Sequence, residues 1–186
     1  ILGSQQAARP AVAPAAATAE AAPAEGRQPP PPLDEARLKT LVASAASEPS
    51  NPAPRVQLGN LYFDAERYAD ARTWYEAALQ IDPRNVNAST DLGIAYYYSN
   101  DPDRALAQFE RSLAVDPAHS KTLLNIGIVR AFGKQDLAGA EKAWQRVIDV
   151  APASQEASVA KRGLEGLRNA HNGQVGAAPN PPAQPQ

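Results

Sequence analysis

The sequence contains no cysteine, no methionine and only two histidines among its 186 residues. The absence of cysteine excludes disulfide bonds, thiolate metal sites and cysteine nucleophiles, and it leaves the redox compartment open. The two histidines, His119 and His171, lie in different segments, so we predict no metal site and no cofactor. Because no methionine stands at position 1, we interpret the sequence as a processed chain or a fragment.

Long apolar runs and runs of one charge are also missing. No segment has the roughly 20 consecutive apolar residues that a helix needs to cross a bilayer. The 18 basic and 20 acidic residues give a formal net charge of −2, and no basic stripe or polybasic run is present. We therefore predict that the domain binds neither nucleic acid nor lipid directly.

Large apolar side chains are scarce at both ends of the chain. Residues 1–32 consist mainly of alanine, proline and glutamine, and residues 172–186 have a similar composition. Such segments cannot bury enough surface to offset the entropy of ordering them, so we expect two disordered tails. The opening residues 1–4 fit either the remnant of a removed signal peptide or membrane anchor, or an arbitrary boundary.

The middle of the chain repeats with a period of about 34 residues. A proline recurs at spacings of 34, 34 and 35 residues, at Pro49, Pro83, Pro117 and Pro152. A Leu-Gly or Ile-Gly pair precedes each of the last three prolines, with its glycine at Gly59, Gly93 or Gly127. Each unit shows apolar residues at helical spacing, then a polar turn, then a second amphipathic segment that ends at the proline. The pattern predicts stacked helix pairs without strands.

These residues resemble the tetratricopeptide repeat, whose signature is Trp-x₂-Leu-Gly-x₂-Tyr, then Ala-x₃-Phe, then Pro. The later signature positions are occupied by Tyr62, Ala71, Tyr75 and Ala78 in the first unit, by Tyr96, Ala105, Phe109 and Ser112 in the second, and by Ala140, Trp144 and Val147 in the third. The resemblance implies an all-α solenoid of three helix pairs, over residues 52–85, 86–119 and 120–154.

The departures from the signature are informative. The tryptophan position holds Arg55, Ser89 or Leu123, and Arg130 stands where the other units have tyrosine. The third unit also carries one extra residue in its turn, so we expect a shifted but unbroken helix pair there.

Two further helices flank the repeats. Residues Leu33–Ser47 occupy the place of a second helix without its first, so residues 33–51 form a half repeat. Residues 155–171 carry charged and apolar residues at helical spacing and are predicted to form a capping helix. A solenoid needs such covers at its ends.

The resemblance also implies where a partner would bind, because the first helices of such repeats line a concave face. An aromatic and aliphatic band and a neighbouring polar line fall at the concave positions. We take these as the candidate partner-binding residues: Asn60, Phe63, Asp91, Ile94, Tyr97, Tyr98, Lys121, Leu124, Asn125, Ile128 and Phe132. Aromatic residues with polar tips are favoured at interfaces.

Three consecutive tyrosines fall at different positions of the repeat and are predicted to have different environments. Tyr96 is predicted to pack between the two helices of its own unit, whereas Tyr97 and Tyr98 are predicted to lie on the concave face and its rim, open to a partner. Burial by the flanking helix, by the chain's own tails or by a second copy is the alternative for part of this band.

Co-chaperone members of the family bind a C-terminal carboxylate through Lys and Asn in repeat one, Asn in repeat two, and Lys and Arg in repeat three. The corresponding residues here are Val56, Asn60, Asp91, Lys121 and Asn125. Only two of the five match, and Asp91 would repel a carboxylate. The sequence therefore disfavours this carboxylate clamp.

No nucleophile elbow, phosphate-binding loop, metal-ligand cluster or dinucleotide fingerprint occurs in the sequence, so we predict no enzymatic activity. The leading hypothesis is a bacterial scaffold or adaptor that binds a peptide or a subunit surface. Its tail composition slightly favours the cell envelope over the cytoplasm and suggests assembly of an envelope complex. The alternative is a structural module that forms homo-oligomers through its repeat faces.

Overall fold

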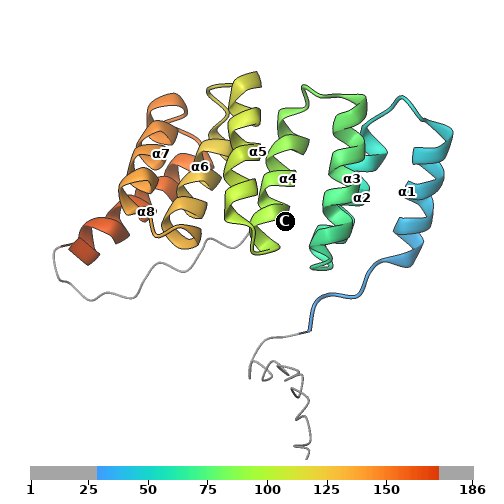
Figure 1. Ribbon diagram of the computed structural model, residues 1–186, viewed down its shortest axis with the longest axis horizontal. Helices are drawn as coiled ribbons and strands as arrows, with labels where there is room; N and C mark the ends of the chain where they lie inside the picture. Colours follow the sequence, from blue (N-terminus) through green and yellow to red (C-terminus); the bar gives the residue numbers. More distant parts are fainter. Residues whose placement is uncertain (1–28, 172–186) are drawn as a thin grey trace, which may run out of the picture.

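The computed structural model describes residues 29–171, which fold into helices without a strand. The helices follow one another along the chain as α1 (Glu35–Ser47), α2 (Ala53–Asp64), α3 (Tyr68–Ile81), α4 (Val86–Tyr98), α5 (Pro102–Val115), α6 (Ser120–Ile128), the single π-helical turn η1 (Val129–Gly133), α7 (Leu137–Val150) and α8 (Gln155–His171). They form one elongated row with α1 at one end and α7 and α8 at the other (Figure 1). The predicted all-α solenoid is therefore confirmed.

Local hydrogen bonds explain where the helices begin. An aspartate or asparagine side chain caps four of them by accepting a backbone N–H from the first turn, at Asp34, Asn85, Asp101 and Asp136. Side-chain caps of this kind satisfy donors that have no partner within the helix. At the start of α5, the side chain of Asp101 accepts from the backbone N–H of Arg104, and Pro102 is the first helical residue.

The turn between the two helices of each pair contains a residue in the left-handed region. Glu66, Asn100 and Gln135 have φ values of 56°, 61° and 55°. In the second unit the backbone N–H of Asp101 then reaches back to the carbonyl oxygen of Tyr96 at 3.0 Å. This arrangement closes the helix and turns the chain towards the second helix of the pair.

The extra residue of the third unit is absorbed in η1. The backbone N–H of Lys134 donates to the carbonyl oxygen of Val129 five residues earlier, at 3.0 Å, and the N–H of Asp136 donates to Arg130 at 2.8 Å. A π-helical turn accommodates one more residue than the α-helical turn it replaces. The helix pair therefore stays intact, as predicted.

Each helix pair is held together where a glycine of the first helix meets an aromatic ring of the second. A Cβ atom on Gly59, Gly93 or Gly127 would overlap the ring of Tyr75, Phe109 or Trp144, respectively. Only glycine permits this approach, so the repeated glycine and the repeated aromatic residue specify one another. The aromatic side chains are almost completely buried.

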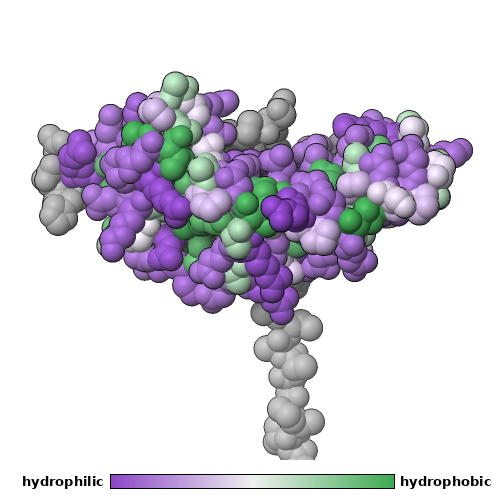
Figure 2. Space-filling model, turned by 90° about the horizontal axis from the view of Figure 1, so that it is seen from above, coloured by the Kyte–Doolittle hydropathy of each residue, from purple (hydrophilic) through white to green (hydrophobic). Residues whose placement is uncertain are grey.

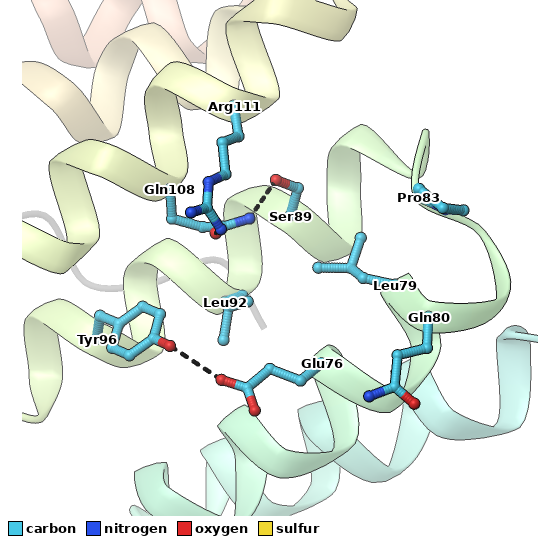
Figure 3. A pocket seen from close by; sticks show the side chains of 9 residues that line it. All are labelled: Glu76, Leu79, Gln80, Pro83, Ser89, Leu92, Tyr96, Gln108 and Arg111. Carbon is cyan, nitrogen blue, oxygen red and sulfur yellow. Dashed lines mark hydrogen bonds between the residues drawn. The ribbon is translucent and has the colours of Figure 1, made fainter.

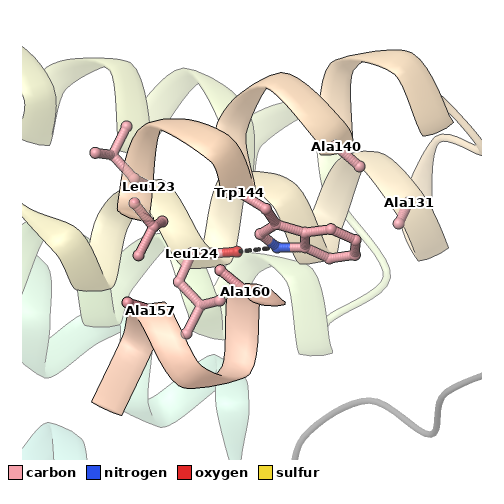
Figure 4. Close-up of a cluster of buried hydrophobic side chains, with 8 residues drawn as sticks. Leu123, Leu124, Ala131, Ala140, Trp144, Ala157 and Ala160 are labelled. Carbon is pink, nitrogen blue, oxygen red and sulfur yellow. Dashed lines mark hydrogen bonds between the residues drawn. The ribbon is translucent and has the colours of Figure 1, made fainter. Parts of the chain in front are cut away.

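The C-terminal end of the row has its own core. Trp144 on α7 lies between α6 and α8, and its indole N–H donates to the carbonyl oxygen of Leu124 at 3.2 Å (Figure 4). Ala157 and Ala160 of α8 are fully buried against this cluster. The helix α8 thus covers the last repeat.

Tyr96 contacts both its own unit and the preceding repeat. Its hydroxyl donates to Glu76 on α3 at 2.9 Å, and the guanidinium groups of Arg72 and Arg104 lie 5.2 and 5.9 Å from the centre of its ring. The side chain is half-buried between α3, α4 and α5. Its ring packs against Ala105 and Phe109 of its own unit, as predicted, and its hydroxyl also bonds to the preceding repeat.

The predicted tails lie largely outside the described residues. Residues 29–32 are exposed and have no regular secondary structure. Among the residues that the structure describes, no helix is both long and apolar enough to span a bilayer.

Candidate protein-binding face

The eleven candidate residues come from α2, α4, α6 and η1, and we call the surface that they were predicted to share the first-helix face. With 3.6 residues per turn, Asp91, Ile94 and Tyr98 project from the same side of α4. Contacts between helices join the set: Phe63 of α2 meets Tyr98 of α4, and Asp91 of α4 meets Lys121 of α6. The structure therefore brings residues from all three repeats towards one another.

Four aromatic rings form a cluster at one end of this face. The ring centres of Phe63 and Tyr98 are 5.4 Å apart at an interplanar angle of 83°, and those of Tyr97 and Tyr98 are 5.6 Å apart at 75°. Tyr68, which the sequence prediction missed, lies 5.1 Å from Phe63 and 5.3 Å from Tyr98. All of these pairs except Tyr68–Tyr98 are edge-to-face, an arrangement that is favourable and fixes the rings relative to one another.

Tyr68 could have been found from its position in the sequence. It is the first residue of α3 and follows the turn directly, so it is adjacent to the end of α2. The signature assigns no role to this position, which is Pro102 and Leu137 in the next two units. An aromatic residue directly after the turn that follows Phe63 could have indicated that Tyr68 lies beside the predicted binding face.

The aliphatic part of the predicted band is largely covered. Ile94 is only 5% exposed and Leu124 only 9% exposed, so the expectation of open concave positions is wrong for both. Leu124 and the half-buried Ile128 pack in the core that α8 closes. Tyr98 and Phe132, by contrast, are each 38% exposed.

In a space-filling view from above, hydrophobic side chains appear as separate patches among hydrophilic ones (Figure 2). Burial of Ile94 and Leu124 interrupts the predicted apolar band. Its exposed members are aromatic.

Tyr97 is partly covered by the third unit. A Cβ atom on Gly133 of η1 would lie 3.1 Å from its ring. Burial, followed by the neighbouring Tyr98, raises the pKa of the Tyr97 hydroxyl, so this group is a neutral hydrogen-bonding group at physiological pH.

The polar line consists of Asn60, Asp91, Lys121 and Asn125, whose side chains form hydrogen bonds and an ion pair within the fold. Lys121 and Asp91 form an ion pair at 2.6 Å, and the side chain of Asn125 donates to the carbonyl oxygen of Lys121 at 2.8 Å. The hydroxyl of Tyr75 donates to the side-chain oxygen of Asn60 at 2.8 Å. Burial, followed by the charges of Asp91 and Asp64, raises the pKa of Tyr75 far above its ordinary value, so it remains a donor.

His119 links the second and third repeats beside this line. Its two ring nitrogens lie 2.7 Å from the hydroxyl of Thr122 and 3.2 Å from the side-chain oxygen of Asn87. Burial is the largest influence and lowers the pKa of His119. Within residues 29–171, no group of three or more histidine or acidic side chains is placed to hold a metal ion.

Comparison with known proteins identifies the family of this repeat fold. Two models of the tetratricopeptide repeat match residues 52–118 and 90–156, and together they span more than half of the chain. The Sgt2 domain from Aspergillus fumigatus is 29% identical with a TM-score of 0.59, covering 73% of this chain and 87% of that one. No curated protein matches the sequence.

Two further solved structures share the fold at lower identity. The first repeat domain of Spaghetti (RPAP3), bound to the HSP90 peptide SRMEEVD, is 24% identical with a TM-score of 0.59, covering 66% of this chain and 94% of that one. MamA is 18% identical with a TM-score of 0.62, covering 74% of this chain and 77% of that one. With its period, its glycine–aromatic pairs and these matches, the chain belongs to the tetratricopeptide repeat family, whose domains are generally non-catalytic protein–protein interaction modules.

Proposed function

We propose that the chain is a scaffold or adaptor whose first-helix face binds a peptide or a subunit surface of a protein partner. The observation that carries this proposal is the partly exposed aromatic cluster on the same face as the Asp91–Lys121 pair. Aromatic anchors beside a few oriented polar groups are the usual composition of the centre of a protein interface.

The cluster is well suited to an anchor because its rings already restrict one another. Phe63, Tyr68, Tyr97 and Tyr98 are linked by ring contacts of 5.1 to 5.6 Å. Side chains that are ordered before binding lose less conformational entropy when a partner arrives. The tyrosine hydroxyls add polar groups at the edge of an apolar surface.

The polar line would orient the bound segment. Asn60 uses its side-chain oxygen and Asn125 its side-chain nitrogen within the fold. In the described part of the chain, the other amide atom of each makes no hydrogen bond, so an extended backbone could use both. Hydrogen bonds to a backbone recognise an extended segment without requiring one sequence.

The carboxylate clamp of the co-chaperones is not the mode that we propose. Spaghetti (RPAP3) shares the fold and binds an HSP90 peptide, but Val56 and Asp91 replace clamp residues here. Lys121, one of the two residues that match, is paired with Asp91 at 2.6 Å. Its charge is therefore already neutralised.

The test is a selection of random displayed peptides on the immobilised full chain, followed by affinity measurements. The Tyr98→Ala/Phe132→Ala variant removes two rings that are each 38% exposed, and we expect at least tenfold weaker binding. The melting temperature should change by no more than about 4 °C, which corresponds to about 1 kcal/mol.

The matched control is Val42→Ala/Val150→Ala, because these side chains are similarly exposed, at 43% and 39%, on helices outside the face. It should bind like the wild type. If the selected peptides bind equally to both double variants, the first-helix face is not the site.

We further propose that the protein acts in the assembly of a bacterial cell-envelope complex. It is supported by the alanine- and proline-rich composition of residues 1–32 and 172–186. Fractionation of source cells that carry the tagged protein, with a photo-crosslinker at position 98, tests it. Recovery of the crosslinked product only from the cytosol would contradict it.

Self-association is a second candidate because the C-terminal end of the solenoid carries an apolar cavity at its surface. A cavity of about 640 Å³ lies between α7 and α8, lined by Leu164, Leu167 and Leu137, which is 51% exposed. Light scattering over a concentration series should show a rising mass that Leu137→Asp abolishes. A constant monomer mass would remove this candidate.

A further inference from the structure

A second cavity lies between α3, α4 and α5, with a volume of about 440 Å³. Its apolar lining includes Leu79 and Leu92, and its polar lining includes Glu76, Gln108 and Arg111 (Figure 3). This volume is within the range of about 300–1,000 Å³ that is typical of sites for small organic groups.

The cavity follows from one residue of the sequence. Ser89 lines it and occupies the signature position for tryptophan. In the first repeat this position is Arg55, whose guanidinium group donates to the carbonyl oxygens of Ala45 at 3.1 Å and Asn51 at 3.0 Å. In the third repeat it is Leu123, which is 2% exposed. In the second repeat the position holds the small side chain of Ser89, which bonds to Gln108 and Ser112, and the cavity lies beside it.

The lining suits an aromatic ring with a polar edge. Leu79 and Leu92 supply apolar contact. The guanidinium group of Arg111 lies 3.4 Å from the side-chain oxygen of Gln108, which holds it beside the cavity. A guanidinium group stacks favourably on the face of an aromatic ring.

The carboxylate of Glu76 provides an acceptor on another wall. One of its oxygens accepts from the hydroxyl of Tyr96 at 2.9 Å, and the second can accept from an incoming N–H or O–H group. The ring of Tyr96 also lines the cavity. A guest ring can therefore contact aliphatic, cationic and aromatic surfaces and donate one hydrogen bond.

This cavity is separate from the first-helix face. On α4, Ser89, Leu92 and Tyr96 project from the side opposite Asp91 and Tyr98 by the helical period. The remaining lining residues come from α3 and α5 and from Pro83, just after α3. None of them belongs to the eleven candidate residues.

We propose that this cavity binds an aromatic side chain, tryptophan above all, presented by a partner protein. The guest takes a place beside Ser89, the position at which the family signature has an indole. A protein partner is the favoured source because the chain belongs to a family of protein-binding modules and because the cavity opens between exposed second helices. The proposal gives the molecule a second contact surface, independent of the first-helix face.

The experiment is a titration of N-acetyl-tryptophanamide into the isotopically labelled full chain, followed by nuclear magnetic resonance. We expect saturable shifts of residues in α3, α4 and α5 that line the cavity. Binding should be at least fivefold tighter than that of N-acetyl-leucinamide, which lacks the ring and its N–H donor.

Two variants locate the site. Ser89→Trp should abolish binding by filling the cavity from within. Because an indole at position 89 must displace Gln108, Arg111→Met provides an independent test at an exposed residue and should weaken binding at least threefold. Arg162→Met, the same exchange at an exposed position on α8, should leave it unchanged.

Three results would overturn the proposal. The first is equal affinity for the leucine and tryptophan amides, and the second is shifts confined to the first-helix face. The third is free tryptophan binding at least tenfold tighter than its amide, which would identify a small-molecule site. None of these results bears on the peptide-binding test at Tyr98 and Phe132.

Discussion

The second and third repeats build the same helix pair with different chemistry in its interior. In the second, Ser89 accepts hydrogen bonds from Gln108 and Ser112, each at 2.7 Å, and all three side chains are buried. In the third, the corresponding interior is apolar and contains Leu123 and Val147. The polar version satisfies its donors but leaves a cavity, whereas the apolar version fills the space.

Their turns differ as well. The second repeat ends its first helix at Tyr98 and closes with Asn100 in the left-handed region. The third inserts η1 before Gln135 takes the same role. The glycine–aromatic contact and the left-handed residue are retained in both, so these features set the backbone and the residues between them are free to vary.

The largest effect should come from Trp144→Ala. Truncation of a buried aromatic residue costs about 3–5 kcal/mol, and we expect Trp144 at the upper end. Its ring lies between Gly127 and Gly163, which have no side chains to fill the space, and its N–H bond to Leu124 is lost. Phe109→Ala in the second repeat should lower the free energy of unfolding by less, about 3 kcal/mol.

Urea denaturation followed by circular dichroism measures both variants. Trp74→Ala is the control, because Trp74 is only partly buried, and it should cost less than either. Equal losses at Trp144 and Phe109 would show that α8 adds nothing to the packing of the third repeat.

The period and the fold could be predicted because they depend on local signals. Proline at 34-residue spacing, the caps such as Asp101, and the Gly93–Phe109 spacing are all visible in the sequence. What could not be predicted depends on contacts between elements. The burial of Leu124 requires knowing where α8 packs, and the cavity at Ser89 requires knowing that no neighbour fills it.

The candidate site was predicted in outline only. The register placed Phe63 and Tyr98 on one face, and the structure joins them by a ring contact. It gave no hint that Asp91 and Lys121 neutralise each other, because their separation depends on how α4 and α6 stack. Tyr68 was missed because the family pattern assigns its position no role.

The next effect in size is expected for Gly127→Ala. Overpacking a core costs about 1–3 kcal/mol, and the added methyl group would overlap the indole of Trp144, which Gly163 confines from the other side. Gly93→Ala should cost less within the same range, because the ring of Phe109 is in close contact with one glycine, Gly93, whereas the indole of Trp144 is in close contact with two.

Thermal unfolding compares these variants with Gly133→Ala. A Cβ atom there would lie 3.0 Å from Pro102 and 3.1 Å from Tyr97, a tight but tolerable contact. The gain of about 0.5–1 kcal/mol from replacing a helical glycine offsets it. A larger loss at Gly93 than at Gly127 would contradict the confinement of the indole.

A smaller loss is expected for Ser89→Ala, which tests the polar interior of the second repeat. Removal of the hydroxyl leaves the amide donor of Gln108 without its acceptor, and an unsatisfied buried donor costs about 1–3 kcal/mol. The hydroxyl of Ser112 can donate instead to the carbonyl oxygen of Gln108, which lies 3.2 Å away, so we expect the lower half of that range.

Ser99→Ala is the matched control in denaturant titrations. Its hydroxyl donates only to the carbonyl oxygen of Ala95 within the same helix, so no buried donor is left behind. A neutral or stabilising Ser89→Ala would mean that the network does not stabilise the repeat.

The smallest effect is a change in the acid dependence of stability at the cap of α7. The backbone N–H of Gly139 donates to the carboxylate of Asp136 at 2.9 Å and Arg130 donates to it at 2.6 Å; these bonds, the backbone one first, lower the pKa of Asp136 below its ordinary value. The carboxylate therefore stabilises the fold above the pKa that it has in the unfolded chain. This contribution is lost as the pH falls through the lower pKa of the folded state.

Asp136→Asn should accordingly flatten the dependence of the urea midpoint on pH below about pH 4, near the ordinary pKa of aspartate, while asparagine keeps the cap. Arg130→Met should flatten it only in part, because the bond from Gly139 remains. An acid dependence that is unchanged in Asp136→Asn would mean that the cap of the third repeat is not linked to protonation. If Arg130→Met flattens it as fully as Asp136→Asn, the arginine that replaces the signature tyrosine, and not the backbone N–H, is the main cause of the lowered pKa.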